Sequence, residues 1–329
     1  MAQQTAVHPW VAGGRERTRF GLSVAIPPDF SRARDFVQAA EALGFDSVWL
    51  PDHPTLGWDS WTNLAALATA TKTIRLGTMV SCVYYRNPVV LARVVADVDR
   101  ISGGRVILGI GSGDLPSEFQ QMGLEFPGPK QRAAVLEEGL KIVPALLRGE
   151  TVEFSGEALS VHGATLRPHA VQQPYVPILV AGGGEKTTLR LVAEYADASN
   201  MGAATWAGGA FNGEDAKRKL AVLNAHCESV GRPPEAVLRT YQIGFVLADT
   251  PEQAASMRDT AMANPARRRM MTFLENVVNF CTPADAVERL LELRQTGFDY
   301  FIGGAGFGAG ELERFAREVV DPVRSAEKV

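Results

Sequence analysis

The feature that most constrains the fold of this chain is an alternation of short apolar runs and longer amphipathic stretches. The apolar runs are typical of buried strands, and the stretches between them carry apolar residues at helical spacing. The predicted strands are residues 20–26, 47–50, 74–82, 106–110, 177–181, 198–201, 239–247 and 300–302. Strands that alternate with helices imply a parallel sheet, and about eight such units fit a closed (β/α)8 barrel better than a doubly wound open sheet.

No linker rich in proline, glycine or serine divides the 329 residues. A single barrel of this length is ordinary, so we expect one α/β domain over 19–329. The polar residues 1–18 are expected to form a flexible, loosely attached N-terminal arm. Two insertions interrupt the pattern: one around 115–170, with a small hairpin over 151–169, and an irregular helical one around 251–281.

Composition argues against several classes of protein. A formal net charge of −4 disfavours a nucleic-acid binder, and no apolar run is long enough to span a membrane. The three cysteines are far apart, and no H-x-H or H-E-x-x-H motif occurs, so neither a disulfide framework nor a metal site is predicted. The first 18 residues lack the apolar stretch of a secretory signal, and we expect a cytoplasmic protein.

In a βα barrel the active site lies at the carboxyl ends of the strands. Asp52 and His53 directly follow the second predicted strand. A neutral imidazole exchanges a proton near pH 7, and the adjacent carboxylate can orient it or bind a ligand. The alternative is that Asp52 caps the following loop and that His53 is an ordinary surface residue.

Glycine-rich turns follow three later strands. The segment 109–114 (GIGSGD) lets the backbone approach a ligand and would direct Asp114 into the barrel mouth, unless Asp114 only caps a helix. Gly182–Gly184, before a helix expected from Glu185, form either a phosphate cradle or a tight turn. Residues 303–306 are a competing phosphate site.

Several segments together resemble the luciferase-like monooxygenase superfamily over roughly residues 19–305. They are LGFDSVWLPDH at 43–53, YRNP at 85–88, SGGRVILGIGSGD at 102–114, AGGGE at 181–185 and LVAEYAD at 191–197. The chain is more similar to the branch that uses the deazaflavin coenzyme F420 than to the branch that uses FMN. In that branch an Asp-His pair ends the second strand and a carboxylate follows the glycine turn, matched here by Asp52, His53 and Asp114.

The resemblance also implies a cofactor site. A non-proline cis peptide in a bulge of the third strand would support the deazaflavin ring, and counting back from Asn87 places it at Thr78–Met79. The cofactor phosphate would lie on residues 182–185. The implied cofactor-binding residues are Asp52, His53, Thr78, Met79, Asn87, Gly111, Ser112, Gly113, Gly182, Gly183, Gly184 and Glu185. Trp58 and Trp61 are expected to line the substrate pocket, although each could equally belong to the core.

The implied activity is hydride transfer between carbon C5 of F420 and a small organic substrate, with His53 and Asp114 as acid/base groups. No nucleic-acid or membrane partner is expected, and relatives of this type suggest a homodimer or a higher homo-oligomer. If FMN is the cofactor, the chain is instead a flavin monooxygenase. Two readings from other classes remain: a non-catalytic cofactor-binding barrel, and a sugar-phosphate isomerase or aldolase, for which no well-placed catalytic Lys or Glu is found.

Overall fold

A closed parallel barrel forms the body of the molecule. The computed structural model describes residues 7–24, 29–265, 268, 271–272, 274, 276–304 and 310–327. The barrel strands, in their order around the ring, are β3 (Arg75–Thr78), β2 (Ser47–Leu50), β1 (Arg19–Ser23), β13 (Tyr300–Gly303), β10 (Leu238–Gln242), β9 (Ala198–Gly202), β8 (Ile178–Ala181) and β5 (Val106–Gly111). Pairing of β3 with β5 closes the ring, and the short β4 (Ser81–Cys82) extends along β5. The predicted eight-stranded barrel is confirmed.

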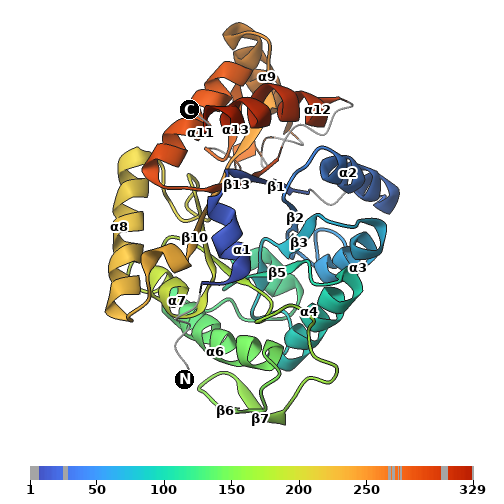
Figure 1. Cartoon of the computed structure of the whole chain (residues 1–329), viewed down its shortest axis with the longest axis vertical. Helices are drawn as coiled ribbons and strands as arrows, with labels where there is room; N and C mark the ends of the chain where they lie inside the picture. The colour runs from blue at the N-terminus through green and yellow to red at the C-terminus, as the bar shows by residue number, and fades with distance from the viewer. Residues whose placement is uncertain are drawn as a thin grey trace.

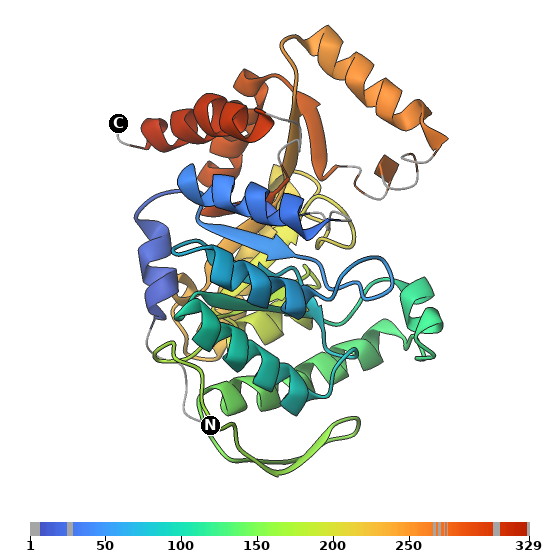
Figure 2. The ribbon, with the colours of Figure 1, turned by 90° about the vertical axis from the view of Figure 1, so that its right-hand side faces the viewer.

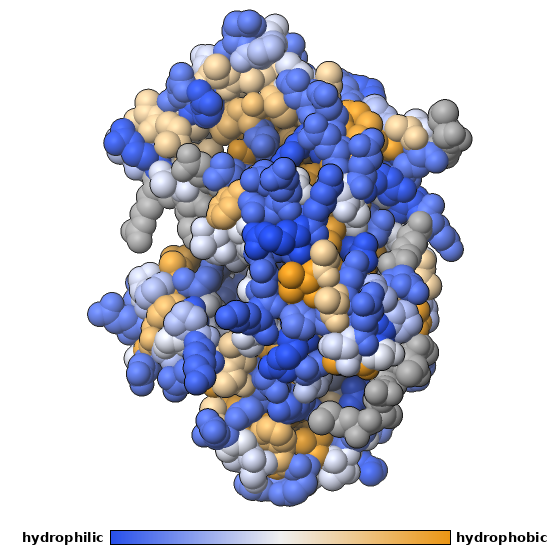
Figure 3. All heavy atoms as spheres, turned by 90° about the vertical axis from the view of Figure 1, so that its left-hand side faces the viewer, coloured by the Kyte–Doolittle hydropathy of each residue, from blue (hydrophilic) through white to orange (hydrophobic). Residues whose placement is uncertain are grey.

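Helices surround this ring (Figure 1). They are α2 (Phe30–Ala42), α3 (Ser60–Ala70), α4 (Pro88–Ser102), α6 (Pro129–Leu147), α7 (Thr188–Tyr195), α8 (Gly213–Ser229) and α11 (Pro283–Thr296), followed by α12 (Glu311–Phe315), a π-helical turn (Ala316–Val320) and α13 (Asp321–Ala326). Helix α8 shows why each helix lies on the barrel: Ala216, Leu220, Leu223 and Cys227 recur on one side and are buried. The outer face that carries α8 is mostly hydrophilic (Figure 3).

The barrel interior is filled by side chains. The buried Trp49 lies across the interior, where Gly21 and Gly77 face it from the two neighbouring strands. A Cβ atom at either glycine would overlap the indole ring, so these two glycines make room for the tryptophan. The indole N–H of Trp49 donates to Oγ of Ser47 at 2.5 Å, which satisfies its only polar group.

The start of the chain closes the amino-terminal end of the barrel. Helix α1 (Pro9–Ala12), followed by a 3-10 turn (Gly13–Arg15), lies over the centre of the ring of strands in Figure 1. Trp10 is 2% exposed and Val11 is fully buried against interior residues of the barrel. Nδ1 of His8 accepts from the Trp10 N–H, and its Nε2 lies 3.0 Å from the Tyr175 carbonyl oxygen. The expectation of a loosely attached arm is therefore wrong for residues 8–12, because their apolar side chains outweigh the polar composition of the segment.

The structure of the first insertion agrees with the prediction from the sequence, whereas the second insertion contains a strand pair that was not predicted. After α5 (Pro116–Gln121) and α6, strands β6 (Val152–Ser155) and β7 (Ser160–Ala164) form the expected hairpin. The second insertion contains α9 (Pro251–Ala263), but β11 (Gly244–Leu247) and β12 (Val278–Cys281) pair as a small parallel sheet. The range predicted as one strand, 239–247, therefore contains two strands that belong to different sheets: β10 to the barrel and β11 to the small sheet. Ile243 still donates to β13, whereas the Gly244 N–H donates to Val277, so the chain changes sheets between these residues.

The described part of the chain contains neither a membrane-spanning helix nor a cluster of metal-binding side chains. None of the helices in the described ranges is long and apolar enough to cross a bilayer. The described His, Cys, Asp and Glu side chains form no group of three that would hold a metal ion.

Candidate active site

The carboxyl ends of the barrel strands meet at the face opposite α1 (Figure 2). Side chains alternate along a strand, so the last inward-facing positions can be inferred from the buried interior residues on the same strands. For β5, β8 and β9 these positions are Gly111, Ala181 and Gly202. None of the three carries more than a methyl group, so β5, β8 and β9 present only small groups at the mouth of the barrel.

His53 lies at this mouth, just after β2, and is held by a buried carboxylate. Nδ1 of His53 lies 2.8 Å from Oε2 of Glu118, whose residue is only 1% exposed. The imidazole side chain is 28% exposed, and Nε2 has no hydrogen-bond partner among the described residues. The ring is therefore fixed through one nitrogen while its other nitrogen is left for a ligand.

Helix α5, which carries Glu118, is anchored by the neighbouring Phe119. The Phe119 ring is fully buried and makes edge-to-face contacts with Tyr84, Tyr85 and Phe126. Gly113 permits this packing, because a Cβ atom there would lie 2.8 Å from the Phe119 ring. The glycine turn after β5 thus positions a carboxylate five residues later rather than only approaching a ligand.

Tyr85 completes the surroundings of that carboxylate. Its hydroxyl donates to Oε2 of Glu118 at 2.8 Å, and the backbone and side chain of Thr55 donate to Oε1. Burial raises the pKa of Glu118, but the hydrogen bonds from Tyr85, Thr55 and His53 lower it by more than burial raises it. The pKa of Glu118 is therefore below 4.5. Burial and the hydrogen bond to Glu118 raise the pKa of Tyr85. Near neutral pH the pair is a carboxylate and a neutral phenol.

Asp52 has a different environment from its neighbour His53. It is 3% exposed, accepts from Ser60 Oγ at 2.9 Å, and is bound by both terminal nitrogens of Arg86, at 2.6 and 3.1 Å. Arg86 also pairs with Asp59. This carboxylate is neutralised inside the protein, and its contacts fix the loop that carries His53.

Asp114 and Ser112 lie on the turn after β5, at the edge of the mouth. Asp114 is exposed and has no hydrogen-bond partner in the described ranges, and Ser112 is half-buried. Asp114 contributes to raising the pKa of Cys82, although burial is the main cause of the rise to about 12. The Cys82 thiol therefore stays protonated, and Asp114 is the exposed carboxylate of this turn.

The bulge between β3 and β4 contains the expected type of peptide bond, one residue later than predicted. The cis bond joins Met79 to Val80, not Thr78 to Met79. Thr78 is buried and donates to the Gly109 carbonyl at 2.7 Å, while Met79 is half-buried. A Cβ atom at Gly111 would lie 2.6 Å from the Val80 side chain, so the bulge packs directly on β5.

The glycine loop after β8 is held from outside the barrel. Lys219 donates to the Gly183 carbonyl at 2.7 Å, and the Glu185 carboxylate pairs with Arg218 and lies 3.7 Å from Nζ of Lys219. Gly183 has no room for a side chain, because a Cβ atom would overlap the carbonyl oxygen of Gly208. Helix α7 begins at Thr188 rather than at Glu185, so residues 185–187 belong to the loop.

A family model described as luciferase-like monooxygenase matches residues 7–300. The chain belongs to the luciferase-like monooxygenase family.

Curated relatives of this luciferase-like chain are oxidoreductases. It is 34% identical over 237 residues to an F420-dependent glucose-6-phosphate dehydrogenase of Kineococcus radiotolerans, covering 67% of this chain and 65% of that protein. It is 32% identical over 179 residues to a 5,10-methylenetetrahydromethanopterin reductase of Archaeoglobus fulgidus, covering 54% of this chain and 51% of the relative. The matches thus span about half to two thirds of the length of these relatives.

Solved structures share the fold at lower identity. An F420-dependent secondary alcohol dehydrogenase in complex with an F420-acetone adduct superimposes with a TM-score of 0.78 at 21% identity, covering 94% of this chain and 99% of that one. The F420-dependent tetrahydromethanopterin reductase of Methanopyrus kandleri gives a TM-score of 0.76 at 20% identity, covering 93% and 99%. These similarities show the luciferase-like barrel.

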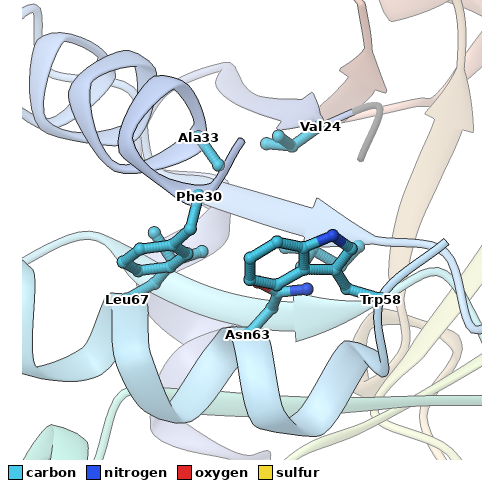
Figure 4. A pocket seen from close by; sticks show the side chains of 7 residues that line it. Val24, Phe30, Ala33, Trp58, Asn63 and Leu67 are labelled. Atoms are coloured by element: carbon cyan, nitrogen blue, oxygen red, sulfur yellow. The ribbon is translucent and has the colours of Figure 1, made fainter. Parts of the chain in front are cut away.

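The two tryptophans predicted to line a substrate pocket have different surroundings. Trp61 is 2% exposed, and its indole N–H donates to Ser81 Oγ at 3.0 Å, which ties α3 to the bulge. Trp58 is 42% exposed and stacks on Phe30, over a cavity of about 10 Å³ that Asn63 and Leu67 also line (Figure 4). Such a volume holds at most one water molecule. This cavity is too small for an organic substrate.

Asn87 is exposed, and its side chain caps α4 by accepting from the Val89 N–H at 2.9 Å. Of the competing phosphate site at 303–306, Gly303 ends β13, and residues 305 and 306 lie outside the described part of the chain. The site residues that sequence reasoning missed are Glu118, Tyr85 and Arg86. Tyr85 and Arg86 stand in the family-like segment YRNP, and Glu118 is the acidic residue in the first turn of α5.

Proposed function

We propose that this luciferase-like protein is an F420-dependent oxidoreductase that transfers a hydride between C5 of the deazaflavin and a small organic substrate. The relatives named as F420-dependent support the choice of cofactor. The observation that carries the proposal is the state of His53 at the barrel mouth: one ring nitrogen is bound to a buried carboxylate and the other has no partner among the described residues. This is the arrangement that a proton-transfer group needs.

The chain offers residues that suit both ends of such a cofactor. The Met79–Val80 bulge, which packs on Gly111 of β5, suits the flat ring system. The backbone of residues 182–185, with Lys219 and Arg218 close by, suits the phosphate. When bound, F420 supplies the hydride acceptor or donor at C5.

His53 balances the proton in this reaction. In the oxidative direction the bound F420 would take up the hydride of a substrate C–H bond, while Nε2 of His53 would accept the proton of the adjacent O–H or N–H group. The substrate loses two electrons and gains a C=O or C=N bond. In the reductive direction, Nε2–H returns the proton as the substrate carbon receives the hydride. Asp114, exposed at the same mouth, is proposed as the second acid/base group.

Cofactor binding by the purified protein is the first test. The chain has five tryptophans, so quenching of their fluorescence can follow titration with oxidised F420 and, separately, with FMN. Tight binding of F420 with weak binding of FMN is expected. A screen of alcohols, imines and activated alkenes with bound F420 should then show substrate-dependent reduction or oxidation of the deazaflavin.

An FMN-dependent monooxygenase is the second candidate. The monooxygenase activity of this candidate is supported by a 4-hydroxyprotoasukamycin monooxygenase of Streptomyces nodosus subsp. asukaensis, 30% identical over 193 residues, which cover 55% of this chain and 51% of that protein. Tight FMN binding with oxygen consumption in the presence of reduced FMN would replace the F420 proposal. Binding of neither cofactor would leave the barrel but refute both functions.

The variant His53→Asn tests the proton-transfer role. Asparagine can still donate a hydrogen bond to Glu118 but cannot take up a proton, so we expect kcat to fall about 100-fold or more while F420 affinity changes less than threefold. Steady-state kinetics and the fluorescence titration measure the two effects. Unchanged kcat in H53N would remove His53 from the chemistry.

A further inference from the structure

We propose that Glu118 is the positioning residue of this site: it holds the neutral imidazole of His53 in the tautomer with the proton on Nδ1, so that the lone pair of Nε2 faces the mouth. The proposal deepens the proposed function and depends on it only for its kinetic readout. Its structural readout needs no cofactor.

The hydrogen bonds around Glu118 determine the tautomer. Oε1 accepts from the Thr55 N–H at 3.1 Å and from the Thr55 hydroxyl at 3.2 Å. Oε2 accepts from the Tyr85 hydroxyl at 2.8 Å and lies 2.8 Å from Nδ1 of His53. A carboxylate in this setting has only acceptor sites, so the hydrogen atom between Oε2 and Nδ1 must come from the imidazole.

Burial makes this arrangement directional. The Glu118 side chain is fully buried, whereas the His53 side chain is 28% exposed. The imidazole therefore has its protein-bound edge inside and its free edge at the mouth.

The other ionisable groups near the mouth are less suited to this role. Asp52 is bound to Arg86, and Arg86 also pairs with Asp59. The Cys82 thiol and the Tyr85 hydroxyl are kept neutral, mainly by burial. Asp114 is exposed and has no ion pair within the described residues. Glu118 is the carboxylate that the structure shows in direct contact with the His53 ring.

Long-range proton–nitrogen NMR of the histidine rings tests the tautomer in the protein without cofactor. The chain has five histidines, and the His53→Asn variant identifies the His53 signals. At a pH where His53 is neutral, we expect the pattern of a protonated Nδ1 and an unprotonated Nε2. A wild-type ring with its proton on Nε2 would overturn the proposal, whatever the cofactor proves to be.

Glu118→Gln reverses the hydrogen-bond pattern at nearly constant volume. Its amide oxygen can still accept from Thr55, but its NH2 group then points at His53 and Tyr85 as a donor. We expect the tautomer signal to move toward protonated Nε2. A ring that keeps the wild-type pattern in E118Q would show that Glu118 does not control it.

Control variants separate this role from general packing. Tyr85→Phe keeps the carboxylate and should keep the tautomer, and Glu118→Asp keeps the charge and should partly restore the wild-type pattern. Glu157→Gln, an exposed residue on the β6–β7 hairpin, should match wild type in every measurement. If E118Q proves unstable in a thermal melt, the wild-type and Y85F spectra still decide the tautomer.

The kinetic readout follows if hydride transfer with F420 is established. E118Q should lower kcat about 10- to 100-fold with little change in F420 affinity, because the lone pair of Nε2 no longer faces the mouth. E118D should recover part of the rate. An active wild type with an unchanged kcat in E118Q refutes the role of Glu118 alone, whereas a wild type that binds no F420 refutes the proposed function.

Discussion

At the scale of single residues, the site is built from two pairs of residues that are adjacent in the sequence, and the members of each pair have different roles. Asp52 and His53 follow β2, and Tyr85 and Arg86 face them from the loop before α4. Arg86 binds Asp52 directly, while Tyr85 reaches His53 through the shared carboxylate of Glu118. Two adjacent ionisable residues thus have opposite roles: Asp52 is internally neutralised, and His53 keeps an open nitrogen.

Removing Arg86 tests the structural role of Asp52. Arg86→Leu leaves a buried carboxylate without its cation, and we expect it to lower the free energy of unfolding by about 3 kcal/mol. The double variant D52N/R86L removes the charge as well and should recover part of that loss. Urea unfolding measures both, and R34L, which breaks an exposed pair with Asp35, should change stability by less than about 0.5 kcal/mol. Equal losses in R86L and R34L would contradict this account.

At the scale of elements, the loop after β8 depends on close contact between two backbone segments. Gly183 lies against Gly208, from the loop after β9, and Lys219 of α8 fixes the Gly183 carbonyl. Three successive parts of the chain therefore determine the shape of one turn. The loop is a structural junction as well as the expected place of a phosphate.

Gly183→Ala tests both roles of the loop, the structural one and the binding of the cofactor phosphate. The added methyl group meets backbone rather than a movable side chain, so we expect a loss of about 1–3 kcal/mol in stability and at least tenfold weaker F420 binding. Gly128→Ala is the matched control, because a Cβ atom there meets nothing within 4 Å. Thermal melts and the fluorescence titration give the two readouts. Wild-type stability in G183A would show that the loop relaxes freely.

Helix α1 is a second element with a testable role. Trp10→Ala removes a buried indole at the amino-terminal end of the barrel, and we expect a loss of about 3–5 kcal/mol. Because α1 lies opposite the mouth, cofactor affinity should be unchanged in the folded variant. Val7→Ala, at a position 38% exposed, should cost less than about 0.5 kcal/mol. Equal unfolding midpoints for W10A and wild type would mean that the barrel does not need this helix.

At the scale of the whole molecule, stability depends on pH through carboxylates that join segments. Glu41 of α2 accepts from the backbone N–H groups of Lys72, Thr73 and Ile74. Burial raises the pKa of Glu41, but these hydrogen bonds outweigh it and bring the pKa below 4.5. As pH falls, the unfolded chain therefore takes up a proton at Glu41 before the folded protein does. The stabilisation by this carboxylate is present above pH 4.5 and is lost as pH falls through the lower pKa of Glu41 in the folded protein.

Comparison of wild type with Glu41→Gln isolates this contribution. The difference in unfolding free energy should be largest near pH 6 and shrink toward pH 3. Asp197 acts with the opposite sign, because burial raises its pKa, but it is present in both proteins and cancels in the difference. Urea titrations at several pH values measure the effect. A difference that stays constant with pH would exclude this carboxylate as a source of acid sensitivity.

The sequence predicted the fold better than the site because the two depend on different kinds of information. Apolar periodicity located all eight barrel strands, and family-like segments singled out His53. The sequence does not predict the roles of Glu118 and Arg86, because these roles depend on distant partners. Glu118 contacts His53, 65 positions away in the chain, and Arg86 contacts Asp52, 34 positions away. Strand β12 was missed for a similar reason: its only strand partner in the described structure, β11, comes from a run that looked like one continuous strand.

The closure of one end of the barrel by α1 has a kinetic consequence. With Trp10 and Val11 at the amino-terminal end and side chains filling the interior, any ligand must arrive and depart through the same mouth. When two ligands meet there, the one lying deeper has to arrive first and depart last. Turnover would then follow a compulsory order, and product inhibition would show which ligand leads.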